Sequence, residues 1–442
     1  MSFIGIDLGA SFIKAAWLNT GNNLVEDVIR EPFPPFLSSL APGRKEVEAG
    51  EILQVVQKLL KKFLEDRGAC DGLLLCGQMH GFVLISPDGK KFKNFISWQD
   101  TRCLSPYDSI DSFFSKTEKR LGSHLISALG NELRPGLPLT TLFTLKIAGQ
   151  LPTGWMPVAL PDFVAAQITG SPAVTHPSNA AAHGLLNVAS GEWSEEARQR
   201  LGLEEMPLPT IKQFNEPAGT IKSKESFFPV YTPVGDQQAA LLGSGLLIRE
   251  VSLNIATGSQ VSCISSSSVH GNWQLRPYFA GKWLRTVTHL PAGRALNKIV
   301  SLLGELATEQ GTPLLKPWEN ISKLAAQADP KKLYVDLSFF PSSVGREGAF
   351  AHITEDELNV GSIFRAAFRS MARNYLSAAK TVAPEGWSKL VFSGGLAIKS
   401  RILREEITEL FGCPHRLSNQ SEDALAGLLV LAKSIKSRSA VL

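Results

Sequence analysis

Three glycine-containing segments of this chain have residue types that suit phosphate binding. The first is IGIDLGASFIK at residues 4–14, where Asp7 ends an apolar run and the turn that follows holds Gly9 and Ser11. Glycine lets phosphate oxygens approach the backbone amides, and a carboxylate beside it can organise Mg²⁺. Lys14, on the returning segment, can add a positive charge. Taken alone, the segment fits a structural hairpin with a turn aspartate equally well.

The second and third segments strengthen the phosphate interpretation. Residues 251–265 repeat the arrangement of strand, glycine turn and strand, with Thr257 and Gly258 in the turn, and Gly394 and Gly395 precede a helical pattern. An ordinary strand-to-helix turn explains the glycine pair by itself, but three such turns together predict a nucleotide cleft. The chain has no GxxxxGK[ST] motif and no complete dinucleotide fingerprint, which excludes the two commonest nucleotide sites.

Asp236 is the candidate general base. It lies in PVGDQQAALLGSG, between a short strand and a helix, so its carboxylate is expected to project from a strand end into a cleft. Phosphoryl transfer to a hydroxyl needs a group in that position to accept the proton. A helix N-cap aspartate with a structural role is the competing interpretation.

A second polar group of residues suits a small polar ligand. In GQMHG at residues 77–81, the two glycines leave room for a ligand beside Met79 and His80, although a histidine in a turn is often structural. In SWQDTRC, Trp98 and Asp100 can offer a ring face and a polar group to a sugar. They fit an aromatic core residue beside an ion pair as well, and Arg102 favours that structural interpretation.

The elements that position these residues follow from hydrophobic periodicity. A boundary near residue 245 divides the chain into expected domains at 1–245 and 246–442, and the repeated hairpin suggests an internal duplication. The predicted strands are 3–7, 12–18, 72–76, 251–256, 261–265 and 390–393, and the predicted helices are 46–62, 292–306, 360–382 and 422–434.

Composition narrows the class of protein. The 442 residues are 44% hydrophobic and 19% charged, which is typical of a globular protein of two domains. The net charge of +4 is spread along the chain, so no basic arm indicates a nucleic-acid partner. No apolar stretch predicts a membrane span and no leader is evident, so we expect a cytoplasmic protein. Five cysteines without paired spacing predict reduced thiols.

These motifs resemble the FGGY family of carbohydrate kinases over essentially the whole chain. IGIDLGAS is similar to the first phosphate motif of the family, NIATGSQV to the second, and FSGGLAIKS to the adenosine motif, although Leu396 replaces a smaller residue. GQMHG resembles the sugar motif of the xylulokinase and sedoheptulokinase branches. The resemblance implies an α/β fold of two actin-like (ribonuclease H-like) domains, each a mixed sheet flanked by helices, with an ATP and sugar cleft between them.

The resemblance also assigns roles to residues. Asp236 is similar to the catalytic base, and Asp7 to the carboxylate that organises Mg²⁺ with the ATP phosphates, with Asp236 nearby. The expected sugar contacts are Met79, His80 and Gln237, with Trp98 and Asp100 as weaker candidates. The expected ATP contacts are Gly9, Ser11, Lys14, Thr257, Gly258, Gly293, Asn297, Gly394, Gly395 and Lys399.

The implied activity is ATP-dependent phosphorylation of the terminal primary hydroxyl of a ketose. WQDTRC and GDQQAALLGS look closer to sedoheptulokinase than to xylulokinase, which favours sedoheptulose. Xylulose, another pentulose or a hydroxymethyl polyol stays open, because single contacts read the stereochemistry of a sugar. A non-catalytic actin-like regulator that binds nucleotide or sugar is the alternative from another class. Dimers are common in the family, so a homodimer is an expectation from the resemblance alone.

Overall fold

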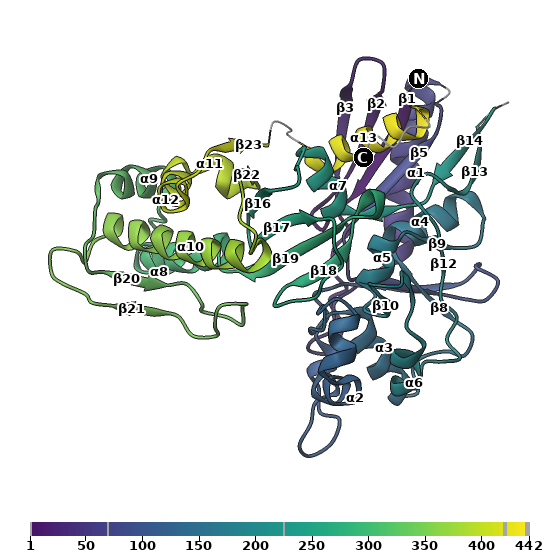
Figure 1. Cartoon of the computed structure of the whole chain (residues 1–442), viewed down its shortest axis with the longest axis horizontal. Coiled ribbons are helices and arrows are strands. Elements are labelled where there is room, and N and C mark those ends of the chain that lie inside the picture. Colours follow the sequence, from purple (N-terminus) through teal and green to yellow (C-terminus); the bar gives the residue numbers. More distant parts are fainter. Residues whose placement is uncertain (1, 69, 224–225, 419–421, 438–442) are drawn as a thin grey trace.

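The computed structural model describes residues 2–68, 70–223, 226–418 and 422–437 of the chain. Two lobes lie side by side, and each is built on a mixed β-sheet covered by helices (Figure 1). Within the described residues, no helix combines the length and apolar character needed to cross a bilayer. All five cysteines are free thiols, as the sequence predicted.

The sheet of the first lobe carries the first glycine turn. β1 pairs antiparallel with β2 and parallel with β5, and Asp7 lies opposite Lys14 in the antiparallel register. The strand order is β13-β14-β5-β1-β2-β3, with β15 paired to β5. The strands are β1 (Ser2–Leu8), β2 (Phe12–Asn19), β3 (Leu24–Pro32), β5 (Leu73–Gly77), β13 (Pro217–Ser223), β14 (Ser226–Tyr231) and β15 (Val234–Gly235).

Both faces of this sheet are covered, which explains why β1 is buried along almost its whole length. Ile4, Ile6 and Leu8 pack on one side with α1 (Ala49–Arg67) and α4 (Leu160–Thr169). Side chains alternate across a strand, so Phe3 and Asp7 belong to the opposite face. The predicted helix at residues 46–62 is present as α1, but it begins later, because residues 46 and 47 form the short strand β4, which pairs with β7 (Phe92–Ile96).

The second sheet repeats the connectivity of the first. β16 pairs antiparallel with β17 and parallel with β22, as β1 does with β2 and β5. The duplication suggested by the two hairpins is confirmed at the level of topology. The strand order is β18-β19-β17-β16-β22-β23. The strands are β16 (Glu250–Ile255), β17 (Ser259–Ser265), β18 (Gln274–Pro277), β19 (Trp283–Leu290), β22 (Lys389–Ser393) and β23 (His415–Leu417).

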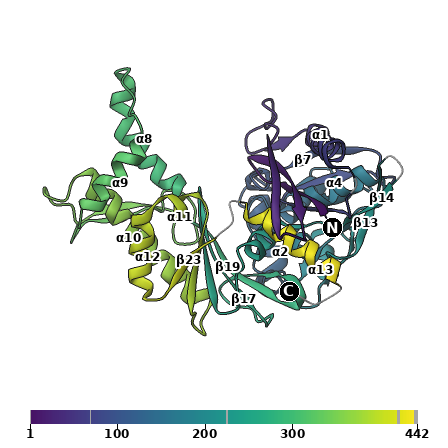
Figure 2. The same ribbon diagram turned by 90° about the horizontal axis from the view of Figure 1, so that it is seen from above.

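Helices and a small hairpin complete the second lobe. α10 lies against α9, α12 and two strands of the sheet, and α8 stands out from the lobe (Figure 2). The predicted helices at 292–306 and 360–382 are both confirmed. The elements are α8 (Gly293–Glu309), α9 (Pro317–Gln327), α10 (Val360–Val382), α11 (Gly395–Lys399), α12 (Arg401–Phe411), β20 (Tyr334–Asp336) and β21 (Ala349–Ala351).

The last helix returns to the first lobe. α13 (Asp423–Ser437) packs against α7 (Asp236–Gly243) and against β1, β2, β3 and β5 (Figure 1). It covers the face of the sheet to which Phe3 and Asp7 belong. The second half of the chain, expected as a domain at 246–442, thus also supplies an element to the core of the first lobe.

A largely helical insertion extends the first lobe below the sheet (Figure 1). Its apolar core is formed by helices and by one face of the four-stranded sheet β4-β7-β6-β8. The backbone N–H of Leu275 in β18 donates to the carbonyl of Gly130 in this insertion at 3.0 Å, so the two lobes share a contact here. The elements are β4 (Glu46–Val47), β6 (Phe82–Ile85), β7 (Phe92–Ile96), β8 (Met156–Ala159), α2 (Phe113–Ala128), α3 (Pro138–Ile147), α5 (Pro177–Ala182) and α6 (Glu195–Leu201).

Candidate active site

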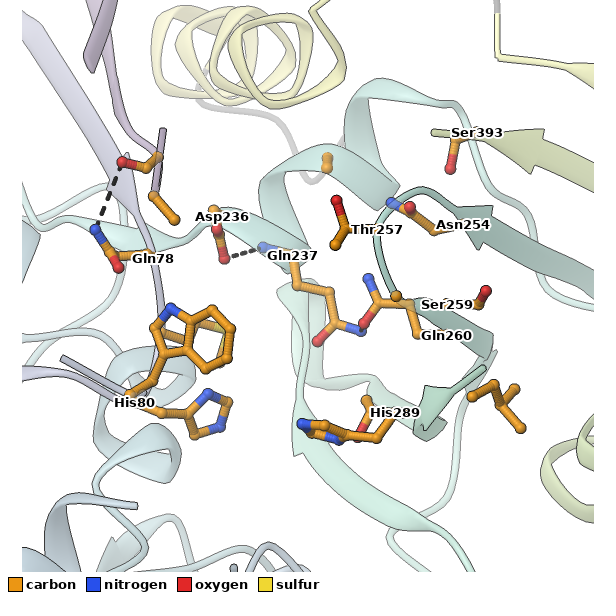
Figure 3. A pocket seen from close by; sticks show the side chains of 18 of the residues that line it. Gln78, His80, Asp236, Gln237, Asn254, Thr257, Ser259, Gln260, His289 and Ser393 are labelled. Atoms are coloured by element: carbon orange, nitrogen blue, oxygen red, sulfur yellow. Dashed lines mark hydrogen bonds between the residues drawn. The ribbon is translucent and has the colours of Figure 1, made fainter. Parts of the chain in front are cut away.

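A cleft of about 630 Å³ lies between the two lobes and receives side chains from both. That volume falls within the usual range for small-molecule sites. Both glycine turns reach it, because β1 and β16 end at the same cleft. Figure 3 shows Asp236 and Gln237 between Gln78 of the first lobe and Thr257 of the second. Ten predicted site residues line the cleft: Asp7, Gly9, Lys14, Met79, His80, Trp98, Asp236, Gln237, Thr257 and Gly258.

Asp7 and Lys14 form one wall of the cleft. Lys14 Nζ donates to Asp7 Oδ2 at 3.4 Å and forms an ion pair with Glu422 Oε2 at 2.8 Å. Asp7 is buried, and burial raises the pKa of its carboxyl although the charge of Lys14 opposes the change. Two carboxylates hold Lys14, which raises the pKa of its ammonium despite partial burial. This lysine is therefore a fixed positive charge next to the first glycine turn.

Asp236 is the first residue of α7 and borders the cleft. β15 pairs with β5 so that Gly235 lies opposite Gly77, which places Asp236 at the same strand ends as Asp7. Ligands of such sheets bind at the carboxyl ends of the strands. Burial and the negative charge of Asp7 raise the pKa of Asp236 to about 7. At neutral pH, Asp236 can therefore both accept and release a proton.

Close contacts explain why glycine occupies position 235, directly before Asp236, and position 81, directly after His80. A side chain at Gly235 would place its Cβ 2.6 Å from Gln238 Oε1 and 3.0 Å from Met79 Sδ. A side chain at Gly81 would place its Cβ 2.4 Å from the Phe95 ring. His80, just before it, has a left-handed backbone with φ of 66°, which few non-glycine residues adopt. Glycine at position 235 therefore leaves room for Met79, and glycine at position 81 leaves room for the Phe95 ring.

The second glycine turn lies against the start of α8. The backbone N–H of Gly293 donates to the carbonyl of Ala256 at 3.1 Å, and that of Arg294 donates to the carbonyl of Thr257 at 2.8 Å. A Cβ at position 293 would lie 2.7 Å from the carbonyl oxygen of Ala256, so the helix can approach the turn only with glycine there. Gly293 therefore lets the start of α8 pack against the second glycine turn.

Seven predicted residues do not line the cleft in this structure: Ser11, Asp100, Gly293, Asn297, Gly394, Gly395 and Lys399. Ser393, directly before the glycine pair, does line it. Asp100 is fully buried and accepts two hydrogen bonds from the guanidinium of Arg102 at 2.8 and 2.7 Å, while Glu46 binds the same guanidinium. This ion-pair network is the structural alternative that the sequence left open for Asp100, and it agrees with the structural role favoured for Arg102.

Sequence reasoning missed a group of arginine, glutamate and histidine residues at one end of the cleft. Arg134, Arg276 and His289 line it, and Arg276 forms a buried ion pair with Glu132 through Nε and through Nη2, the latter at 3.0 Å. Arg276 Nη1 also donates to Gln237 Oε1. The only local signal was a charged residue within an apolar segment, in ELRPG and in QLRPY. Nothing in either segment indicates the other, because 144 residues separate the two partners.

Comparison with known proteins decides the family. Residues 2–243, more than half of the chain, match the N-terminal domain of the FGGY family of carbohydrate kinases. The chain belongs to this family. It is 27% identical to the xylulose kinase of Staphylococcus xylosus over 335 residues, which is 71% of this chain and 66% of that protein. The regions matched in three xylulose kinases span 66%, 49% and 52% of their lengths.

Solved structures share the fold of this chain over its whole length. The gluconate kinase of Lactobacillus acidophilus superposes with a TM-score of 0.86 at 17% identity, over 100% of this chain and 90% of that one. A Plasmodium falciparum glycerol kinase with ADP superposes with a TM-score of 0.81 at 16% identity, over 99% of this chain and 90% of that one. The expected α/β fold of two actin-like domains is thereby confirmed.

Proposed function

We propose that this FGGY protein is an ATP-dependent kinase that phosphorylates the terminal primary hydroxyl of a ketose. The observation that carries the proposal is the place of Asp236. This carboxyl has a pKa of about 7 and lines the same cleft as the two glycine turns, Met79 and His80. A base with such a pKa is matched to accept a proton from a sugar hydroxyl at neutral pH.

The phosphate side of the cleft is assigned to the two turns. Gly9, Thr257 and Gly258 line it with accessible backbone, and Lys14 supplies a fixed positive charge. Gly293 and Asn297 at the start of α8, Gly394 and Gly395 at the start of α11, Ser11 in the first turn, and Lys399 are proposed for the rest of the nucleotide. Their contacts require the ligand or a movement of the lobes.

The proposed reaction is an in-line phosphoryl transfer. The sugar oxygen forms a bond to the γ-phosphorus as the bond between that phosphorus and the bridging oxygen of ADP breaks. Asp236 takes the proton of the hydroxyl, and ADP leaves with the electron pair of the broken bond. Positioning by both lobes and neutralisation of the phosphate charges supply most of the rate enhancement.

The residues present fit Mg²⁺ bound together with phosphates. Asp7 and Asp236 are carboxylates at the ends of β1 and β15, which pair with the two sides of β5, and each raises the pKa of a neighbour through its negative charge. A divalent cation would relieve that repulsion. Among the described residues no cluster of three or more ligating side chains offers a site built from protein alone, and Mg²⁺ commonly takes one or two carboxylates plus substrate phosphates. Bound there, the ion would neutralise charge on the phosphates.

The sugar side is assigned to Met79, His80 and Gln237, with Trp98 offering a partly exposed ring face. Asp100 is left out of this assignment because its carboxylate is occupied by Arg102. Sedoheptulose is the proposed acceptor from the motif resemblance. Xylulose is the second candidate, which the names of the related xylulose kinases favour.

A coupled assay of ADP release tests the proposal. Sedoheptulose, xylulose, ribulose and glycerol are offered separately with ATP and Mg²⁺. We expect sugar-dependent release with a ketose, and a loss of about a hundredfold to ten-thousandfold in the Asp236→Ala variant. Asp66→Ala, at an exposed position of α1, is the control. Binding of nucleotide and sugar without any release would instead favour the regulator, and turnover of glycerol alone would overturn the ketose assignment.

A further inference from the structure

The charged cluster at one end of the cleft holds more positive than negative charge. Glu132 is buried and forms its ion pair with Arg276 through both carboxylate oxygens. Arg134 approaches the same carboxylate, but only to 3.9 Å between Nη1 and Oε2. One carboxylate is thus shared by two guanidinium groups, and the bidentate pair with Arg276 is much the tighter.

Arg134 has an unused hydrogen-bond donor in this cluster. Its Nη1 atom is buried, although a fifth of the side chain is exposed, and it meets no acceptor among the described residues. Burial lowers the pKa of Arg134 to about 10, so the guanidinium is charged at neutral pH. A buried charged donor without a partner is costly, and such atoms commonly mark a place that a ligand completes.

His80 belongs to the same cluster, because its ring approaches the same Glu132 oxygen as Arg134 does. Its Nε2 atom lies 3.4 Å from Glu132 Oε2, and burial lowers the pKa of the ring to about 3, so the ring is neutral. The tautomer with the proton on Nε2 avoids repulsion with the carboxylate and leaves Nδ1 as an acceptor. Donor and acceptor together match a hydroxyl group, which both accepts and donates. A carboxylate ligand could satisfy only the donor.

The cluster lies beyond Asp236 as seen from the phosphate turns. The charge of Arg276 shifts the pKa of both Asp236 and His80. The charges of Asp7 and Lys14 are among the main causes of the shift at Asp236 but not at His80. In Figure 3, His80 and His289 lie on the side of the pocket opposite to Asn254 and Ser393. A sugar whose reacting hydroxyl is at Asp236 would therefore extend its remaining carbons toward Arg134.

We propose that Arg134 determines specificity by donating a hydrogen bond to a hydroxyl on the part of the sugar remote from the reacting carbon. The inference rests on the proposed kinase function. It assigns the acceptor to neutral polyhydroxy sugars long enough to reach the cluster. Glu132 positions Arg134 through its negative charge and also binds Arg276. Neither Arg134 nor Glu132 is among the site residues inferred from the sequence motifs.

The test compares wild-type protein with Arg134→Met and Arg134→Gln, with kinetics and binding measured on each. For the preferred ketose we expect Arg134→Met to lower kcat/KM by about tenfold to a hundredfold, mainly through KM, with the Kd of ADP unchanged. Arg134→Gln, which keeps a donor, should recover part of the loss. Arg44→Met, outside the cleft lining, is the control and should behave like wild type. Thermal melting checks that each variant folds.

The outcomes separate this inference from the function on which it rests. If wild-type protein releases no ADP with any sugar, the kinase proposal fails. If wild type turns over a ketose and Arg134→Met keeps the same KM for it, only the role of Arg134 is overturned. An aldonate such as gluconate preferred over every neutral sugar, with that preference lost in Arg134→Met, would overturn the hydroxyl assignment and indicate carboxylate recognition.

Discussion

Two carboxyl groups of like charge face one cleft, and each changes the proton affinity of its surroundings. Burial and the negative charge of Asp7 raise the pKa of Asp236 to about 7, while the positive charge of Lys14 opposes part of that shift. Asp7, which we propose to organise Mg²⁺ and phosphate, thus also raises the pKa of the proposed base. The chemistry of this site depends on how close two strand ends lie, and on no single residue.

A pH profile tests this coupling between residues. Below a pH of about 7 the free protein holds Asp236 protonated, so kcat/KM for the sugar should fall with decreasing pH. Asp7→Asn removes a negative charge, which lowers the pKa of Asp236 and moves the acid limb to lower pH, even though overall activity drops. The profiles of both proteins are measured from pH 5 to 9. An acid limb in the variant at the wild-type position would contradict the coupling.

At the scale of elements, the crossing of α7 and α13 positions two parts of the site. α7 begins with Asp236, and Glu422, which precedes α13, binds Lys14. A Cβ at Gly427 would lie 1.9 Å from the carbonyl oxygen of Ala239, and one at Gly243 would lie 1.9 Å from that of Asp423. Only glycine at both positions lets the two helix backbones approach so closely.

Gly427→Val should therefore destabilise the protein strongly. The added side chain meets backbone on α7, which cannot move without displacing Asp236, so we expect a loss of about 3 kcal/mol in the free energy of unfolding. Gly50→Ala is the control, since its Cβ would meet only Glu48 Oε1 at 3.9 Å. Urea titration measures both. Equal stabilities for the two variants would mean that the helices separate without cost.

Glu422 links the C-terminal helix to the phosphate side. Its carboxylate binds Lys14 at 2.8 Å and is itself held by Arg30 at 2.5 Å. Glu422→Gln should loosen Lys14 and raise the KM for ATP by about tenfold, with the KM for the sugar unchanged. Glu31→Gln, which removes the partner of the exposed Lys58, is the control. A change in the KM for the sugar alone would contradict the assignment of Lys14 to phosphate.

At the scale of the whole molecule, we expect the part of the second lobe that holds α8–α12 to move toward the cleft when ligands bind. β18 is bonded to the helical insertion, so this edge of the second sheet stays with the first lobe, whereas α8–α12 lie away from it (Figures 1 and 2). Residues proposed for the nucleotide, including Asn297, Gly394 and Lys399, belong to the outlying part. Closure of that part would bring them toward the ligand and exclude water.

Small-angle X-ray scattering tests this movement. We expect the radius of gyration to decrease when ADP and the ketose are added together, and to change less with the ketose alone, because the proposed nucleotide contacts lie on both lobes. Glu132→Gln should weaken the contact at β18, since it removes the charge that Arg276 requires. Scattering that is identical with and without both ligands would show that the lobes do not close.

The sequence by itself determined the features that depend on local pattern. Alternation predicted the two hairpins around Gly9 and Gly258, helical periodicity predicted α10 to the residue, and residue type placed Asp7, Asp236 and Met79 at a cleft. Each of these is encoded within a short segment, where hydrophobic period and turn chemistry are decisive. The family resemblance and the fold it implied were confirmed by the match over residues 2–243.

Only the tertiary structure decided which distant segments meet. It paired Glu132 with Arg276, gave Asp100 to Arg102 instead of the cleft, and returned α13 to the first sheet so that Glu422 reaches Lys14. Ion pairs between residues far apart leave no local period in the sequence, and an apolar helix carries no mark of the sheet that it covers. Their partners are set by the packing of the whole chain, where the burial of charge leaves few arrangements satisfied.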